Sequence, residues 1–211
     1  MENPLKTVKV PIGLRKAYFG LITEEPEGAH PTYDVPVNMG GNVKAALSVT
    51  TASGEIHADD VSQLDFETFV KAQLDAETAC DDLELNAMIF GHSFSEENGE
   101  LSGGDDLASL GGYAFIQDIL LKNKTHKYRA IFLFKVSAMP SSEKLDAQTR
   151  AGSFDPKMNV ISYSVHLDNA SKWRWRKEFT SQAAAEEWIM SVFKGTATVI
   201  AQTAQKVAAA K

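Results

Sequence analysis

Three side chains that could do chemistry stand close together in the stretch GEIHADDVSQL. His57, Asp59 and Asp60 are residue types that bind metal ions or transfer protons. A catalytic zinc site needs three protein ligands that converge on one point, with further groups orienting them. Adjacent aspartates point apart on an extended backbone, and the other four histidines stand at no ligand spacing from one another. The sequence therefore favours a solvated acidic turn over a metal site.

Nucleophilic catalysis and phosphate binding have equally little support. The only cysteine, Cys80, lies in a segment predicted to be helical, and the chain has no G-x-S-x-G motif. The loop GELSGGDDLASLGG is rich in glycine, but it lacks a P-loop lysine and its two aspartates would repel a phosphate. We therefore expect no catalytic residue, no metal ligand and no cofactor, and we expect that the protein is not an enzyme.

Basic and aromatic residues alternate in KWRWRKEF, residues 172–179. Such interleaving could form a stacking platform for nucleic acid. With the period of two of a β-strand, however, Trp173, Trp175 and Phe179 fall on one face together with Lys177. The opposite face carries Lys172, Arg174, Arg176 and Glu178. We expect buried aromatic side chains beneath an outer row of cations.

The composition is that of a globular protein. The chain has 211 residues, of which 44% are hydrophobic and 23% charged, and this length suits a single β-rich domain. A lone cysteine fits a reducing cytoplasm. No apolar run approaches the roughly 18 residues that cross a bilayer, and the start MENPLKTVKVPIG lacks the apolar stretch of a secretion signal. These features predict a soluble protein made in the cytoplasm, with no membrane partner.

Charge is distributed unevenly along the chain. Residues 1–105 carry 19 acidic and 6 basic side chains, whereas residues 106–211 carry 9 acidic and 15 basic ones, so a net charge of −13 is followed by one of +6. The total of −7 argues against a conventional nucleic-acid binder, which needs cations to displace counterions from phosphates. If the two halves occupy different faces, copies of the chain would attract one another head to tail.

Seven segments alternate with the period of a half-buried strand. They span residues 16–23, 43–50, 64–74, 112–121, 128–138, 158–167 and 172–179. In the clearest of them the even positions from Leu64 to Leu74 form one face. The turn residues of LDNASK predict that the last two strands form an antiparallel hairpin.

Two short helices and two exposed loops complete the predicted elements. Thr78 and Asp81 resemble a capping box that opens a helix ending at Gly91, and a second helix starts at Thr180 or Ser181 and ends before Gly195. Its apolar stripe consists of Ala184, Ala185, Trp188, Ile189, Val192 and Phe193. Residues 23–36 and 93–112 are predicted loops. We expect one domain over residues 1–195 and a tail or inter-subunit arm over residues 196–211.

In their order along the chain these segments resemble the major tail proteins, or tail tube proteins, of long-tailed bacteriophages, in the compact type from phages of Gram-positive hosts. VPIGLRKAYFGLITEE is similar to the family's opening, and GEIHADDVSQL to its acidic turn before a long strand, although the family's tyrosine is absent here. FETFVKAQLDAETACDDLELNAMIFG, the polar connection PSSEKLDAQTR and the closing helix SQAAAEEWIMSVF continue the resemblance, which covers most of residues 10–194.

The resemblance implies a fold and a function. The fold is mainly β with short helices (α+β), a tail-tube-like β-sandwich of two packed antiparallel sheets flanked by helix. Six copies close into a ring, and rings stack head to tail into a tube through which double-stranded DNA passes without specific binding. The implied partners are further copies of the chain, the tape measure protein, and the tail terminator or tip proteins. The implied location is the virion tail, after synthesis in the host cytoplasm.

The same resemblance suggests roles for the charged residues. An acidic lumen repels DNA phosphates, and the lumen-facing candidates are Asp59, Asp60, Asp65 and Glu67. The candidates for contacts between subunits are Glu24, Glu25, Glu27, Asp105, Asp106, Arg174 and Arg176. The alternative is a β-sandwich module that binds a carbohydrate or small molecule through exposed tryptophans. An enzyme, supported only by the HADD turn, comes third.

Overall fold

The computed structural model describes residues 8–58, 61–143 and 158–196. Its elements are β1 (Lys9–Glu24), β2 (Thr32–Tyr33), β3 (Val37–Asn38), β4 (Asn42–Ala58), β5 (Val61–Thr78), α1 (Leu83–Phe90), β6 (Ser93–Ser95), β7 (Gly99–Leu101), β8 (Leu110–Leu121), β9 (His126–Ala138), the 3-10 turn η1 (Pro140–Ser142), β10 (Asn159–His166), β11 (Arg174–Phe179) and α2 (Gln182–Phe193). All seven predicted strands are present, and β1, β4 and β5 are longer than the alternation predicts. The chain is mainly β with two short helices, as predicted.

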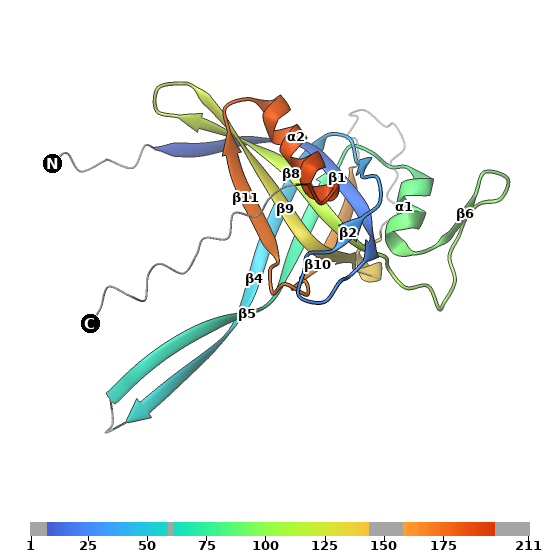
Figure 1. Cartoon of the computed structure of the whole chain (residues 1–211). Helices are drawn as coiled ribbons and strands as arrows, with labels where there is room; N and C mark the ends of the chain where they lie inside the picture. Colours follow the sequence, from blue (N-terminus) through green and yellow to red (C-terminus); the bar gives the residue numbers. More distant parts are fainter. Residues whose placement is uncertain (1–7, 59–60, 144–157, 197–211) are drawn as a thin grey trace, which may run out of the picture.

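Nine strands form one antiparallel sheet (Figure 1). The order is β2-β1-β8-β9-β10-β5-β4, while β3 also pairs with β1 and β11 with β9. Strands β6 and β7 form a separate two-stranded ribbon. In Figure 1 this ribbon and α1 lie on the opposite side of the fold from the end of the β4–β5 hairpin.

The nine-stranded sheet folds over on itself around the larger core. Tyr163 on β10 and Phe19 on β1 are separated by β8 and β9 in the strand order, which would place them about 14 Å apart in a flat sheet. Their ring centroids are only 6.2 Å apart, and Tyr163 also lies 5.1 Å from the ring of Tyr113. Two antiparallel layers therefore enclose one core, which confirms the predicted β-sandwich.

Helix α2 covers the outer face of the sheet and builds a second core. Ser181 caps the helix, since its hydroxyl accepts the N–H of Ala184 at 3.3 Å. The apolar stripe then packs against β8, β9 and β11, as its helical spacing predicts. The buried side chains of this helix are Ala185, Trp188, Ile189, Val192 and Phe193. The flanking helix of the prediction is confirmed.

The predicted hairpin between the last two strands is wrong. Both β10 and β11 pair antiparallel with the same edge of β9, where His166 faces Lys135 and Arg174 faces Leu133. The connection forms a tight loop whose Asp168 carboxylate accepts the N–H of Lys172 at 2.6 Å. The chain then continues in its earlier direction along β9. Residues that are typical of a hairpin turn therefore form a loop here that does not reverse the chain.

The β4–β5 hairpin is the longest feature of the sheet, and its outer part projects away from the rest of the fold (Figure 1). Thr50 pairs with Lys71 but Thr51 pairs with Phe69, so Val70 forms a bulge. A bulge reverses the alternation of side chains beyond it. Phe69 therefore packs against the larger core although it lies outside the predicted apolar face. The single even-numbered face predicted from Leu64 to Leu74 is wrong for this reason.

Helix α1 begins one turn later than predicted. Asp82 is its N-cap, and its carboxylate accepts the N–H of Leu85 at 2.9 Å. Thr78 instead ends β5, where it pairs with Asn159 of β10, so strand pairing overrides the capping signal. Cys80 lies in the connection and not in the helix. Gly91 ends α1 in the left-handed conformation, as predicted.

Candidate functional site

The described side chains of the outer β4–β5 hairpin, up to residue 54 and from residue 67, are mostly exposed. Val49 and Val70 retain 46% and 52% of their accessible surface, and Ser53 and Glu67 are exposed further out. A two-stranded ribbon that buries no apolar face is marginally stable in water. The hairpin is therefore a surface that a binding partner would stabilise.

The sequence of this hairpin makes its end strongly acidic. Residues 50–70 contain five acidic side chains and neither Lys nor Arg. Glu55 of β4 lies opposite Asp65 of β5 in the register. Glu55 belongs to the same acidic end, and the sequence reasoning missed it because it stands on the other strand.

Two of the lumen-facing candidates lie outside the described residues. These are Asp59 and Asp60, which stand between β4 and β5 in the chain. Asp65 and Glu67 are both in β5, and the exposed Glu67 lies opposite Ser53. His57 lies in β4 opposite Ser62.

The acidic candidates for subunit contacts differ in their surroundings. Glu24, Glu27 and Asp105 are exposed. Glu25 forms an ion pair with Lys135 of the same chain, with 2.6 Å between Oε1 and Nζ. Asp106 accepts the N–H of Gly103 at 2.6 Å and so closes its own loop.

The tryptophans of KWRWRKEF lie on opposite sides of the sheet, which corrects the prediction that they share a face. Trp173 precedes β11 and stacks on Phe69 at the larger core, with ring centroids 4.9 Å apart. Trp175 packs in the second core, 4.9 Å from the ring of Trp188. Strand alternation begins only at Arg174, because Trp173 still belongs to the connecting loop.

The cationic row on β11 has few internal partners. The Arg174 guanidinium lies 4.2 Å from the ring centroid of Trp173, and burial together with the charge of Arg176 lowers the pKa of Arg174. Neither arginine forms an ion pair with a carboxylate of residues 8–58, 61–143 or 158–196. The neighbouring Glu178 is already held by Lys9 at 2.6 Å and Arg129 at 2.8 Å. Arg174 and Arg176 are therefore available for acidic groups of another molecule.

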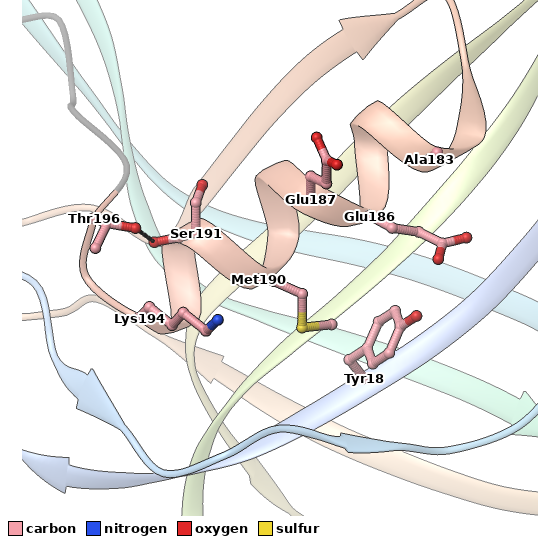
Figure 2. A pocket seen from close by; sticks show the side chains of 8 residues that line it. All are labelled: Tyr18, Ala183, Glu186, Glu187, Met190, Ser191, Lys194 and Thr196. Carbon is pink, nitrogen blue, oxygen red and sulfur yellow. Dashed lines mark hydrogen bonds between the residues drawn. The ribbon is translucent and has the colours of Figure 1, made fainter.

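A surface hollow of about 510 Å³ lies beside α2 (Figure 2). It is lined by Tyr18, Ala183, Glu186, Glu187, Met190, Ser191, Lys194 and Thr196. Burial raises the pKa of the Tyr18 hydroxyl, and the charge of Glu186 raises it further. Glu186 itself pairs with Lys16, with 2.8 Å between oxygen and nitrogen. The lining contains no nucleophile paired with a base, so the hollow has no evident catalytic chemistry.

Asp118 is a buried carboxylate that connects β8 to β1 and β9. Its oxygens accept hydrogen bonds from Arg15 at 2.9 Å and from His126 at 2.8 Å. Burial would raise the pKa of Asp118, but the hydrogen bonds and charges of His126 and Arg15 outweigh burial and hold the pKa below its usual range. A lowered native pKa gives a stabilisation that is complete above the unfolded value, about 3.9, and is lost as the pH falls through the native value.

We expect Asp118→Asn to lower the free energy of unfolding by about 2 kcal/mol at pH 7, because the charge-assisted hydrogen bonds from Arg15 and His126 are lost or weakened in a buried position. Urea denaturation at pH 7 and at pH 3 measures the effect. The difference from the wild type should shrink at pH 3. Asp105→Asn, at an exposed position, serves as the control and should change little. An equal loss at both pH values would contradict the assignment.

None of the helices in the described part of the chain is both long and apolar enough to cross a membrane. No protein-family model matches the chain, and no curated protein matches it significantly. The tail-protein resemblance of the sequence therefore stays a prediction.

Proposed function

We propose that the protein is a structural, non-enzymatic virion component that assembles into stacked hexameric rings and forms a phage tail tube. The observation that carries this proposal is the long β4–β5 hairpin, which projects from the sandwich (Figure 1). Its described outer side chains are mostly exposed, and the sequence of its end is acidic. Such a hairpin buries its surface only when another molecule packs against it. Identical copies are the partner that the charge pattern of the chain favours.

Ring closure would pair the free edge of the sheet and cover exposed apolar side chains. Strand β4 ends the strand order of the sheet, and an unpaired edge invites uncontrolled pairing. Exposed apolar side chains lie on the edge strand and around the start of β1. They include Val43 and Val49 of β4, Val8 before β1, and Val10 and Ile12 in β1. Hairpins that join around a ring into a closed barrel would pair the edge and cover these residues.

The charges then suggest how the tube would work. With five acids and no cation in residues 50–70, a ring of six hairpins would line a bore with negative charge. Such a bore repels DNA phosphates, whereas a cationic bore would bind each turn of DNA and slow its passage. Asp59, Asp60, Asp65 and Glu67 are the proposed lumen residues. The proposal includes the tape measure protein and the tail terminator or tip proteins as partners.

When rings stack head to tail, one surface of a subunit contacts a different surface of a subunit in the next ring. Heterologous contacts do not close, so they generate an open filament. Arg174 and Arg176 offer cations that have no carboxylate partner among the described residues. The exposed Glu24, Glu27 and Asp105 offer carboxylates. These are the proposed charged contacts between subunits.

The test is the assembly state of the purified protein. We expect rings or tubes in negative-stain electron micrographs of concentrated samples, and a rising mass with concentration in light scattering. Assembly should weaken at high salt if ion pairs hold the rings together. Monomers at every concentration, with purified tip or terminator proteins present as initiators, would rule the proposal out.

The alternative, a carbohydrate- or small-molecule-binding module, has less support. It requires accessible aromatic side chains, but Trp188 is 8% exposed and Trp173 lies between Phe69 and Arg174. The hollow beside Trp175 measures about 200 Å³, which is smaller than most ligand pockets.

A further inference from the structure

Three potential metal ligands converge at the base of the β6–β7 ribbon. His92, Glu100 and Glu143 each offer one ligand atom, and these atoms all lie within 4.8 Å of one another. They come from three separate segments: the residue before β6, strand β7, and the end of the 3-10 turn η1. The prediction of no metal ligand rests on spacing along the chain, which cannot reveal such a cluster.

The backbone holds His92 in a fixed position. It directly follows Gly91, whose left-handed conformation ends α1, and the N–H of His92 donates to the carbonyl of Ala87 at 2.9 Å. The imidazole stacks on Phe90, with ring centroids 5.7 Å apart. Its side chain is only 9% exposed. A ligand that is already ordered loses little conformational entropy when it binds an ion.

The backbone around the other two ligands is also held in place. Glu100 pairs with Phe94 across the ribbon, and its side chain is 15% exposed. Glu143 follows Ser142, whose hydroxyl donates to the Met139 carbonyl and accepts the N–H of Ser162. The site is therefore a partly dehydrated pair, His92 and Glu100, with the exposed Glu143 beside it.

An ion would fit between His92 and Glu100 after a small increase in the distance between their side chains. Nδ1 of His92 lies 2.7 Å from a carboxylate oxygen of Glu100 and 3.2 Å from the Ser102 hydroxyl. Ligand atoms around a tetrahedral zinc ion are about 3.3 Å apart, so the pair would separate by about 0.6 Å. The ion would replace the hydrogen bond between the two side chains.

The segment of the chain that contains His92 and Glu100 is acidic, which favours a cation. Residues 72–121 contain eleven acidic side chains and no Lys or Arg. Among the residues that the structure describes, no Lys or Arg forms an ion pair with Glu100 or Glu143. By contrast, the carboxylate beside His126 is also held by Arg15, which would repel an ion there.

We propose that His92, Glu100 and Glu143 bind one divalent transition-metal ion of the Zn²⁺ type, with water completing the coordination. One imidazole and two carboxylates form a donor set that suits zinc, whereas Mg²⁺ and Ca²⁺ prefer oxygen ligands alone. The ion joins the β6–β7 ribbon to η1. It stabilises a ribbon of three residues per strand that is too short to be rigid by itself.

Isothermal titration of the untagged, EDTA-treated and dialysed full-length protein with ZnCl₂ tests the proposal. We expect one equivalent to bind, with millimolar Mg²⁺ failing to displace it. Glu143→Gln is the decisive variant, because this exposed side chain can change without disturbing the fold. It and His92→Ala should weaken zinc binding by about 100-fold or more.

Control measurements separate coordination from other effects. His126→Ala removes another carboxylate-paired histidine and Cys80→Ser removes the only thiol, and both variants should bind zinc as the wild type does. Zinc should also raise the melting temperature and slow hydrogen exchange over residues 93–101 in the wild type, but not in Glu143→Gln. No saturable binding, or binding that both ligand variants retain in full, would overturn the proposal.

Discussion

Replacing residues 52–68 with the dipeptide Asn-Gly is expected to abolish assembly while leaving a folded monomer. The change removes the acidic end of the β4–β5 hairpin and joins Thr51 to Phe69, which face each other in the register. Asn-Gly favours the two-residue turn that such a pair requires. Phe69 and the bulge at Val70 remain, so the contact with Trp173 is kept. The described side chains that are lost, on either side of the tip, are mostly exposed.

Light scattering and negative-stain microscopy measure this effect, and thermal unfolding reports on the monomer. We expect monomers at concentrations where the wild type forms rings, with a free energy of unfolding within about 1 kcal/mol of the wild-type monomer. Ser53→Ala alters one exposed side chain of the same hairpin and should assemble normally. Rings formed by the shortened protein would show that other surfaces carry assembly.

Trp188→Ala is expected to have the largest effect on stability. Trp188 is the largest side chain that α2 buries, and its ring lies 4.9 Å from that of Trp175 and 5.9 Å from that of Phe179. Truncation removes the burial of a large aromatic side chain and leaves a cavity, which costs about 3–5 kcal/mol. Domains are stable by only about 5–15 kcal/mol, so a large part of the total is lost.

Urea denaturation of the monomer checks this prediction through the midpoint of unfolding. The control is Glu187→Ala, which changes the exposed residue that directly precedes Trp188 in the same helix. It should shift the free energy of unfolding by less than about 0.5 kcal/mol. A loss below about 1 kcal/mol for Trp188→Ala would mean that α2 contributes little to the stability of the sandwich.

Local patterns were enough to predict most of the elements. The period of two located all seven long strands, and helical spacing located the buried face of α2 from Ala185 to Phe193. The second helix is capped by Ser181, one of the two predicted starts, and Gly91 ends α1 as predicted. These predictions succeed because burial of one face sets the periodicity of the sequence, and because caps and left-handed glycines act within a few residues.

Pairing between distant segments was not predictable in the same way. LDNASK has the composition of a hairpin turn, yet β10 and β11 follow each other along one edge of β9. The bulge at Val70 also depends on the partner strand, since only pairing with β4 decides which residue is left unpaired. Strand register is a property of two segments, and the pattern of one strand does not contain it.

The sequence by itself determined the mainly β fold, the two amphipathic helices and the acidic character of the segment around Asp65. Only the tertiary structure decided that this segment projects as a hairpin, that Glu25 is paired with Lys135, and that His92 meets Glu100 and Glu143. The physical reason is the distance along the chain over which each interaction acts. Burial and helix capping act on neighbours in the chain, whereas charges and metal ligands act through space between residues that only folding brings together.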